Sequence, residues 1–312
     1  MRRIIIDTDT GTDDAVAIIM ALRDPDVKVE AITTVQGNVS VDRATVNALM
    51  SIEAAETYQP PVYKGFALPI VKEVDLSLNL LGHGEDGMGD IGLPPPKIKA
   101  EDEHAVDFLI RYIEENPYEL EIVTIGPVTN LAWVCHRSPG TLSKVKKIYM
   151  MMGSGLWPGN TTPLAEGNAH MDPEALDIVF RYAGCDIVLI GYDLCIHEYI
   201  FDEKDVAALY ATGSKRAKFC CDIGHILIDL NMERFGVAGI DWADPAAMAV
   251  ALDPGMIEQS IEAYHRCDTN KGLSYGAVAI DWQKLSGKKP NAVTVTKIDA
   301  ARMKKCVIDR IV

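Results

Sequence analysis

The most informative segment for the fold is Ile4-Ile5-Ile6-Asp7-Thr8-Asp9-Thr10-Gly11-Thr12-Asp13-Asp14-Ala15. Its three consecutive isoleucines are typical of a buried strand, and the pattern that follows Thr12 predicts a helix. Four aspartates therefore crowd the turn at the carboxyl end of the first strand. This is the edge of the sheet at which open α/β folds bind their ligands.

Outward from this turn, short runs rich in Ile and Val alternate with helix-period stretches, as in βαβ units that build a parallel sheet. The predicted strands are Arg3–Ile6, Val29–Thr34, Leu120–Ile125, Lys146–Met152 and Asp186–Ile190. The predicted helices are Asp13–Leu22, Val41–Ala55, Glu103–Glu115, Val128–Cys135 and Pro173–Tyr182.

After Ile200 the rhythm changes, but no Ser/Gly linker or charge run marks a boundary. We expect helices at Lys204–Ala211 and Lys215–Phe235 and short strands at Ala277–Asp281 and Ala292–Thr296. The prediction is one α/β domain over residues 1–312, with a mostly parallel, Rossmann-like central sheet flanked by helices and extra C-terminal helices and short strands. Two long loops, Gly65–Ala100 and Gly153–Asp172, are expected to carry function.

Charge and composition limit the partners. Lys and Arg total 30 against 45 Asp and Glu, a formal net charge of -15, so the surface should repel polyanions, and we expect no nucleic-acid partner. No segment approaches the ~18 uninterrupted apolar residues that a membrane span needs, so no membrane partner is expected. The seven cysteines are odd in number and form no C-x-x-C pair, which indicates a reduced set and a cytoplasmic protein.

The acidic turn requires something to offset its charge, since four carboxylates within eight residues repel one another. A hard cation bound by oxygen ligands, calcium or magnesium, would do so. The alternative is a solvated acidic turn that caps the first helix. A phosphohydrolase of the haloacid dehalogenase type also begins with a strand and D-x-D, which would make Asp7 a nucleophile, although that family has Thr or Val where this chain has Gly11.

Several motifs together resemble the inosine-uridine nucleoside hydrolase family, which cleaves the N-glycosidic bond of ribonucleosides with water. The matching segments stand in family order and span most of the chain: Asp7 to Ala15, where the family usually has Pro in place of Thr10, Ile32 to Asn38, His83 to Gly89, Gly126 to Asn130, Ala165 to Asn168, Asp172 to Ala175, and Asp244-Pro245.

The resemblance implies one Ca²⁺ held by Asp9, Asp14, Asp244 and the backbone carbonyl of Ile125. Calcium takes about 6–8 oxygen ligands, which leaves positions for a water and the ribose 2′- and 3′-hydroxyls. Asp9 would then be the general base for the calcium-bound water. The ribose-binding residues implied by the family are Asp13, Asn38, Asn160, Glu166 and Asn168, with Met152 packed under the sugar.

The resemblance weakens at the base end of the site. Many family members have a His immediately before the metal-binding Asp, which protonates the leaving base, and here that position is Ala243. His83 is the candidate to contact the base or the ribose 5′-hydroxyl; the alternative is a loop His that only orders its segment. Trp242 is the candidate to stack on the base, and the alternative is a core Trp. We therefore predict that ribose specificity is retained and that base preference is unusual.

Three functions follow for testing. The first is a calcium-dependent ribonucleoside hydrolase, which the resemblance implies is a homodimer or homotetramer of nucleoside salvage. The second is the phosphohydrolase with Asp7 as nucleophile. The third is a non-catalytic nucleoside- or ribose-binding protein that kept the cation site. Purine or pyrimidine preference does not follow from the sequence.

Overall fold

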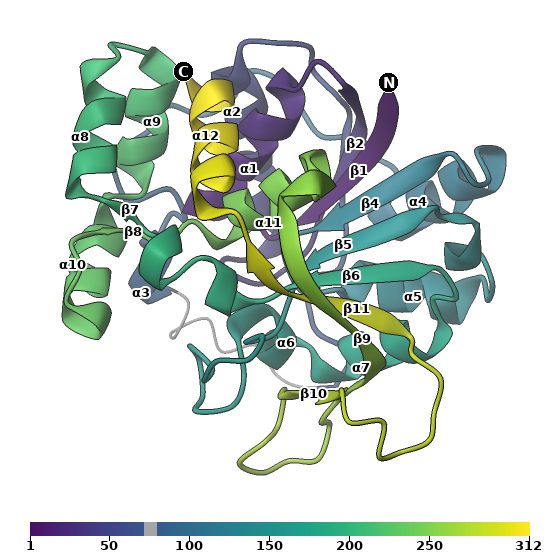
Figure 1. The fold of residues 1–312 in the computed structure, drawn as a ribbon. Coiled ribbons are helices and arrows are strands. Elements are labelled where there is room, and N and C mark those ends of the chain that lie inside the picture. The colour runs from purple at the N-terminus through teal and green to yellow at the C-terminus, as the bar shows by residue number, and fades with distance from the viewer. Residues whose placement is uncertain (72–79) are drawn as a thin grey trace.

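The computed structural model describes residues 1–71 and 80–312 (Figure 1). The first predicted strand is an interior strand of a large sheet, third from one edge. The strands are β1 (Arg2–Thr8), β2 (Val27–Thr34), β3 (Val62–Lys64), β4 (Leu120–Thr124), β5 (Lys147–Met151), β6 (Asp186–Ile190), β7 (Phe201–Asp202), β8 (Gly239–Ile240), β9 (Ile257–Cys267), β10 (Val278–Asp281) and β11 (Ala292–Ile298). The helices are α1 (Thr12–Arg23), α2 (Val41–Ala55), α3 (Leu80–His83), α4 (Ala105–Glu115), α5 (Thr129–Arg137), α6 (Gly167–Met171), α7 (Pro173–Tyr182), α8 (Glu203–Ala211), α9 (Lys215–Ile223), α10 (His225–Phe235), α11 (Ala243–Leu252) and α12 (Ala300–Ile311).

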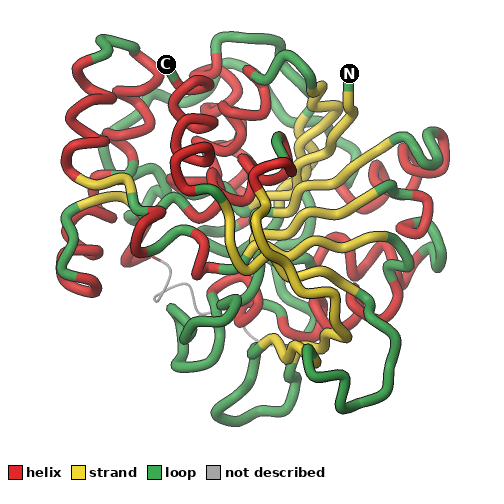
Figure 2. The backbone as a smooth tube through the Cα atoms, viewed as in Figure 1, coloured by secondary structure: helices red, strands yellow, loops and turns green. Residues whose placement is uncertain are grey.

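The central sheet has nine strands in the order β10-β9-β11-β6-β5-β4-β1-β2-β3. All neighbours from β11 to β3 pair in parallel, whereas β9 pairs antiparallel with β11 and β10. The predicted single α/β domain with a mostly parallel sheet is therefore confirmed. Figure 2 shows the loops that adjoin β9, β10 and β11 projecting from one side of the molecule.

The isoleucine run explains why helices cover both faces of the sheet. Successive side chains of a strand point to opposite faces, so Ile4 and Ile6 enter one core and Ile5 enters the other. The first core includes residues of α1, α2, α9, α11 and α12, and the second includes residues of α4, α5 and α7. Because both faces of this strand pack against apolar cores, its sequence is continuously apolar and does not alternate with polar residues.

The position of β1 between β2 and β4 places the acidic turn at a switch point of the sheet. In register, Asp7 pairs with Thr33 of β2 and with Thr124 of β4. The backbone continues this pairing past the strand, because Ile125 N–H donates to the Asp7 carbonyl at 2.9 Å. Loops that leave such neighbouring strands toward opposite faces open a crevice at the carboxyl edge.

The structure differs from the sequence prediction in several elements. The predicted helix from 215 to 235 is two helices, α9 and α10, because the chain turns at Gly224. Strands β3, β7, β8 and β9 and helices α3, α6, α11 and α12 were not predicted. The long loop from 65 to 100 contains α3, and its residues 72–79 lie outside the described part of the chain. Among the described residues, no helix combines the length and the apolar character needed to cross a bilayer.

Candidate active site

The acidic turn is fixed by hydrogen bonds at the start of α1. Gly11 caps the helix, and its N–H donates to Asp14 Oδ2 at 2.9 Å. The Thr8 hydroxyl donates to Asp14 Oδ1 at 2.6 Å, and Asn38 Nδ2 donates to Asp14 Oδ2 at 3.1 Å. Both oxygens of Asp14 are therefore held in place from three directions.

A second acidic residue arrives from the far end of the chain. Asp244 lies in the first turn of α11, and its N–H donates to Asp13 Oδ2 at 3.4 Å. Carboxylate oxygens of Asp13, Asp14 and Asp244 all lie within 4.8 Å of one another, and all three residues are buried. The fold thus brings the late Asp-Pro motif onto the N-terminal turn.

Asp9 lies beside this cluster. Its Oδ2 accepts the Asn38 N–H at 2.6 Å, and its Oδ1 is buried without a hydrogen-bond partner in the described structure. Two glycines pack against the carboxylate: a Cβ on Gly37 would lie 1.9 Å from Oδ2, and a Cβ on Gly126 would lie 2.6 Å from Oδ1. Only glycine leaves room for Asp9 at these two positions.

A bound cation would offset the repulsion among the buried carboxylates of this cluster. Burial, and next the charge of Asp14, raises the pKa of Asp9 well above its usual range. Burial, and next the charge of Asp13, raises the pKa of Asp14 to about 6, and the same two causes raise that of Asp244. Buried oxygens of Asp9 and Asp13 also lack partners among the described residues. Carboxylate oxygens that lie close together, some of them without a hydrogen-bond partner, and that have no sulfur or nitrogen ligand among them are the ligands that a hard divalent ion prefers.

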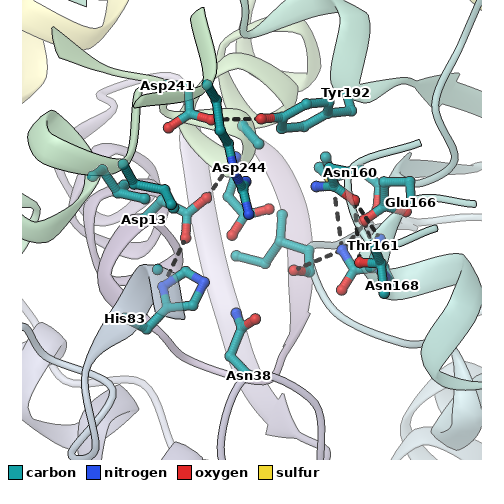
Figure 3. Close-up of a pocket in the computed structure, with 18 residues that line it drawn as sticks. Asp13, Asn38, His83, Asn160, Thr161, Glu166, Asn168, Tyr192, Asp241 and Asp244 are labelled. Atoms are coloured by element: carbon teal, nitrogen blue, oxygen red, sulfur yellow. Dashed lines mark hydrogen bonds and ion pairs between the residues drawn. The ribbon is translucent and has the colours of Figure 1, made fainter. Parts of the chain in front are cut away.

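A polar cavity opens over the cluster (Figure 3). Its lining comes from the carboxyl ends of the strands, from α3, from α10 and from the loop before α6. The lining residues are Asp13, Asn38, Gly82, His83, Ile125, Met151, Asn160, Thr161, Glu166, Gly167, Asn168, Tyr192, Leu227, Leu230, Arg234, Asp241, Ala243 and Asp244.

Amide and carboxylate groups of the second long loop gather on one side of this cavity (Figure 3). Glu166 caps α6 and accepts N–H bonds from Gly153 at 2.8 Å, Asn168 at 2.7 Å and Ala169 at 3.2 Å. Burial raises the pKa of Glu166 to about 7. Asn160 Oδ1 accepts the Gly167 N–H at 3.0 Å. This hydrogen bond ties the loop to the start of α6.

The Ile125 carbonyl, predicted as a cation ligand, has a neighbour from the same loop. Asn168 Nδ2 lies 3.5 Å from this oxygen and donates to the Met151 carbonyl at 3.1 Å. Ile125 and Asn168 therefore meet at the cavity lining. Asn168 lies on the side away from His83 in Figure 3.

His83 faces the acidic turn from α3. Its Nδ1 accepts the Thr12 N–H at 3.3 Å and lies 2.9 Å from the Thr12 hydroxyl and 3.8 Å from Asp13 Oδ1. Because an amide N–H can only donate, the neutral ring carries its proton on Nε2. The predicted contact residue thus lies at the cavity with a ring N–H available.

Five residues from the sequence interpretation lie outside the described cavity lining: Asp9 and Asp14 of the acidic turn, and Met152, Trp242 and Asp7. Met152 is buried and donates its N–H to the Ile190 carbonyl, and its neighbour Met151 lines the cavity instead. Trp242 is 1% exposed, and its ring lies 4.7 Å from that of Phe201, which is the core position that was the alternative. Asp7 is fully buried under the turn, where Oδ1 accepts from Thr33 and from Asn130, so the geometry does not support its role as a phosphohydrolase nucleophile.

The cavity also contains residues that the sequence did not single out. Tyr192 follows β6 and Arg234 lies in α10, and both line the cavity with Asp241. Tyr192 lies two residues after the carboxyl end of the parallel strand β6. Because ligands bind at this edge of a parallel sheet, its position in the sequence could have identified it as a candidate site residue.

Comparison with known proteins agrees with this geometry. The family model described as inosine-uridine preferring nucleoside hydrolase matches residues 4–305. The chain belongs to this family. Uridine nucleosidase 1 of Arabidopsis thaliana is 37% identical to this nucleoside hydrolase over 290 residues, covering 92% of this chain and 85% of the relative.

Solved structures of nucleoside hydrolases share the whole fold. A plant nucleoside hydrolase superposes with a TM-score of 0.91 at 32% identity, covering 99% of this chain and 98% of the other. A purine-preferring ribonucleoside hydrolase from Gardnerella vaginalis gives a TM-score of 0.91 at 30% identity with the same coverage. These relatives are named for different bases, so family membership establishes an enzyme family that cleaves ribonucleosides and leaves the base open.

Proposed function

We propose that this enzyme hydrolyses the N-glycosidic bond of ribonucleosides with a calcium ion held by Asp9, Asp14, Asp244 and the Ile125 carbonyl. The observation that carries the proposal is that carboxylate oxygens of Asp13 and Asp14, in the first turn of α1, and of Asp244, in the first turn of α11, lie within 4.8 Å of one another at a polar cavity. When bound, the ion would position water and the ribose diol and raise the acidity of that water.

The ribose is bound by side chains on two sides of the cavity. Asn38 comes from the loop after β2 and Asp13 from the first turn of α1, while Asn160 and Glu166 come from the loop before α6 and Asn168 from α6 itself. Their carboxylate and amide oxygens suit the positive charge that develops on the sugar as the bond breaks.

The proton of the attacking water goes to Asp9. Its Oδ1 has no other partner in the described structure, whereas Oδ2 is held by the Asn38 N–H at 2.6 Å. One oxygen therefore orients the carboxylate and the other accepts the proton. A positioned base of this kind contributes about 10²–10⁴-fold in rate.

The leaving base has no acid at the position of Ala243, which lines the cavity. We propose that this makes the base preference unusual. The test compares inosine with a ribonucleoside analogue whose leaving group needs no protonation, such as p-nitrophenyl riboside. Inosine should react more slowly, and equal rates would show that Ala243 has not removed a needed acid.

The activity itself is tested with a panel of ribonucleosides and their 2′-deoxy counterparts, with free base measured by chromatography. We expect base release from ribonucleosides, slower release from 2′-deoxynucleosides, and loss of both in a chelator. Thermal stabilisation by nucleosides without any base release would instead identify a non-catalytic binding protein.

A role in nucleoside salvage in the cytoplasm and assembly as a homodimer or homotetramer remain predictions. Size-exclusion chromatography with light scattering tests the assembly, and a monomer would contradict it.

A further inference from the structure

A buried polar cluster around Asp241, two residues before Ala243 in the sequence, is not among the residues proposed to bind the ribose. Asp241 follows β8, and its Oδ2 accepts a hydrogen bond from the Tyr192 hydroxyl at 2.8 Å. Its Oδ1 accepts from Asn231 Nδ2 at 2.8 Å, and Asn231 also donates to the Gly239 carbonyl at 3.0 Å. The carboxylate is thus fixed by partners from α10 and from the segment after β6.

This cluster faces the cavity on a different side from Asn38 (Figure 3). Asp241 and Tyr192 line the cavity although they are only 7% and 5% exposed. Each oxygen of Asp241 accepts one side-chain hydrogen bond and has a second lone pair. A carboxylate held in this way offers a fixed acceptor to an N–H group of a ligand.

A cation completes the arrangement. Arg234 of α10 lines the same cavity. Among the described residues it forms no ion pair, either with Asp241 or with another carboxylate. It lies close enough for its charge to act on the Tyr192 phenol. A guanidinium has only hydrogen-bond donors. Arg234 can therefore bind an acceptor oxygen of a ligand in the cavity that Asp241 also lines.

The phenol itself is a poor acid for the leaving base. Burial, and next the charge of Asp241, raises the pKa of Tyr192 far above its usual range. Its hydroxyl proton is also committed to Asp241. The cluster therefore provides recognition and charge, and does not replace the missing His.

We infer that Asp241 and Arg234 form a base-recognition subsite that selects nucleobases with a lactam edge, an N–H group next to a C=O group. Uracil and hypoxanthine have this edge. Asp241 accepts the N–H, and Arg234 donates to the carbonyl and offsets the negative charge that builds on it as the bond breaks. Cytosine and adenine in the same pose turn a ring-nitrogen lone pair toward the carboxylate and are disfavoured. Tyr192 is a positioning residue. The inference rests on the proposed hydrolase function.

Uridine and cytidine provide the test, because they have the same shape and differ only at this edge. The wild-type enzyme should favour uridine in kcat/KM by about 10–100-fold, the value of one hydrogen bond to a charged group. The variant Asp241→Asn keeps the size and an acceptor for Tyr192 but presents N–H donors, so the ratio should fall about tenfold or invert. Arg234→Gln should lower kcat for uridine, and Tyr192→Phe should reduce the ratio mainly through KM.

Glu233→Gln is the matched control, since Glu233 is the exposed neighbour of Arg234 on α10 and lies outside the described lining. It should leave the ratio unchanged. An unchanged ratio in folded Asp241→Asn, or no wild-type preference for uridine, overturns the inference. If Asp241→Asn does not fold, Arg234→Gln decides, because Arg234 is exposed.

Absence of any base release from wild-type enzyme would refute the proposed function alone. In that case calorimetry still tests the subsite: uridine should bind at least about tenfold more tightly than cytidine, and this difference should disappear in Asp241→Asn. Equal binding of the two nucleosides would overturn the recognition.

Discussion

The variant Gly37→Ala tests whether the position of Asp9 governs turnover. A Cβ at this position would lie 1.9 Å from Asp9 Oδ2, 2.6 Å from Cγ and 2.7 Å from Cβ, whereas contacts under 3.0 Å essentially never occur. The carboxylate must therefore move by about 1 Å, away from the Asn38 N–H that orients it. Misplacement of a catalytic group by 1 Å costs about 10²-fold in rate.

The assay measures kcat/KM for the best ribonucleoside together with urea unfolding. We expect about a 10²-fold loss of kcat/KM and a loss of about 1–3 kcal/mol in the free energy of unfolding, the usual cost of overpacking. Gly272→Ala is the control, since its Cβ would meet nothing closer than the Asn270 carbonyl at 4.0 Å. Folded Gly37→Ala protein with kcat/KM within about threefold of wild type would refute the role of Asp9.

Three further predictions concern the cation and the leaving base. Asp14→Asn should lower calcium affinity and kcat/KM by at least about 10–100-fold, the loss that even outer-shell changes cause; calorimetry that finds unchanged affinity would contradict the ligand assignment. The pKa values of Asp14 (about 6) and Glu166 (about 7) are raised by burial, so the folded state holds their protons more tightly than the unfolded chain. Metal-free protein should therefore lose stability, by on the order of 5 kcal/mol from the two groups together, as the pH rises from about 4 to about 7, and urea unfolding in chelator that shows flat or rising stability would be inconsistent with this. Ala243→His should raise kcat for inosine by about 10²-fold and leave p-nitrophenyl riboside unchanged, which steady-state kinetics on both substrates will show.

The sequence predicted the strands that are buried on both faces, because their apolar runs have a single structural explanation. Helices α2 and α7 and strand β6 have the predicted bounds. Strand β9 was missed because its first residues, Ile257 to Ser260, are all exposed or half-buried, so this part of the strand has no continuous apolar run. The split of α9 from α10 depends on how Gly224 packs against Ile240, a contact that local sequence does not encode.

The site shows the same division. The acidic turn and the Asp-Pro motif were recognisable from their residues, and the fold brings Asp14 and Asp244 together. The base end was less predictable because its groups depend on which way a side chain turns at the end of an element. Asp241 faces the cavity while its neighbour Trp242 enters the core, and Tyr192 reaches Asp241 across 49 residues of sequence.

Calcium titration of chelator-stripped protein by calorimetry tests the central claim most directly, namely that the carboxylates of the first turn and of α11 enclose a divalent ion. We expect one bound Ca²⁺ per chain, tighter binding when a ribonucleoside is present, and loss of the binding heat in Asp244→Asn. Protein that binds no calcium, yet releases base at the same rate before and after stripping, would contradict it.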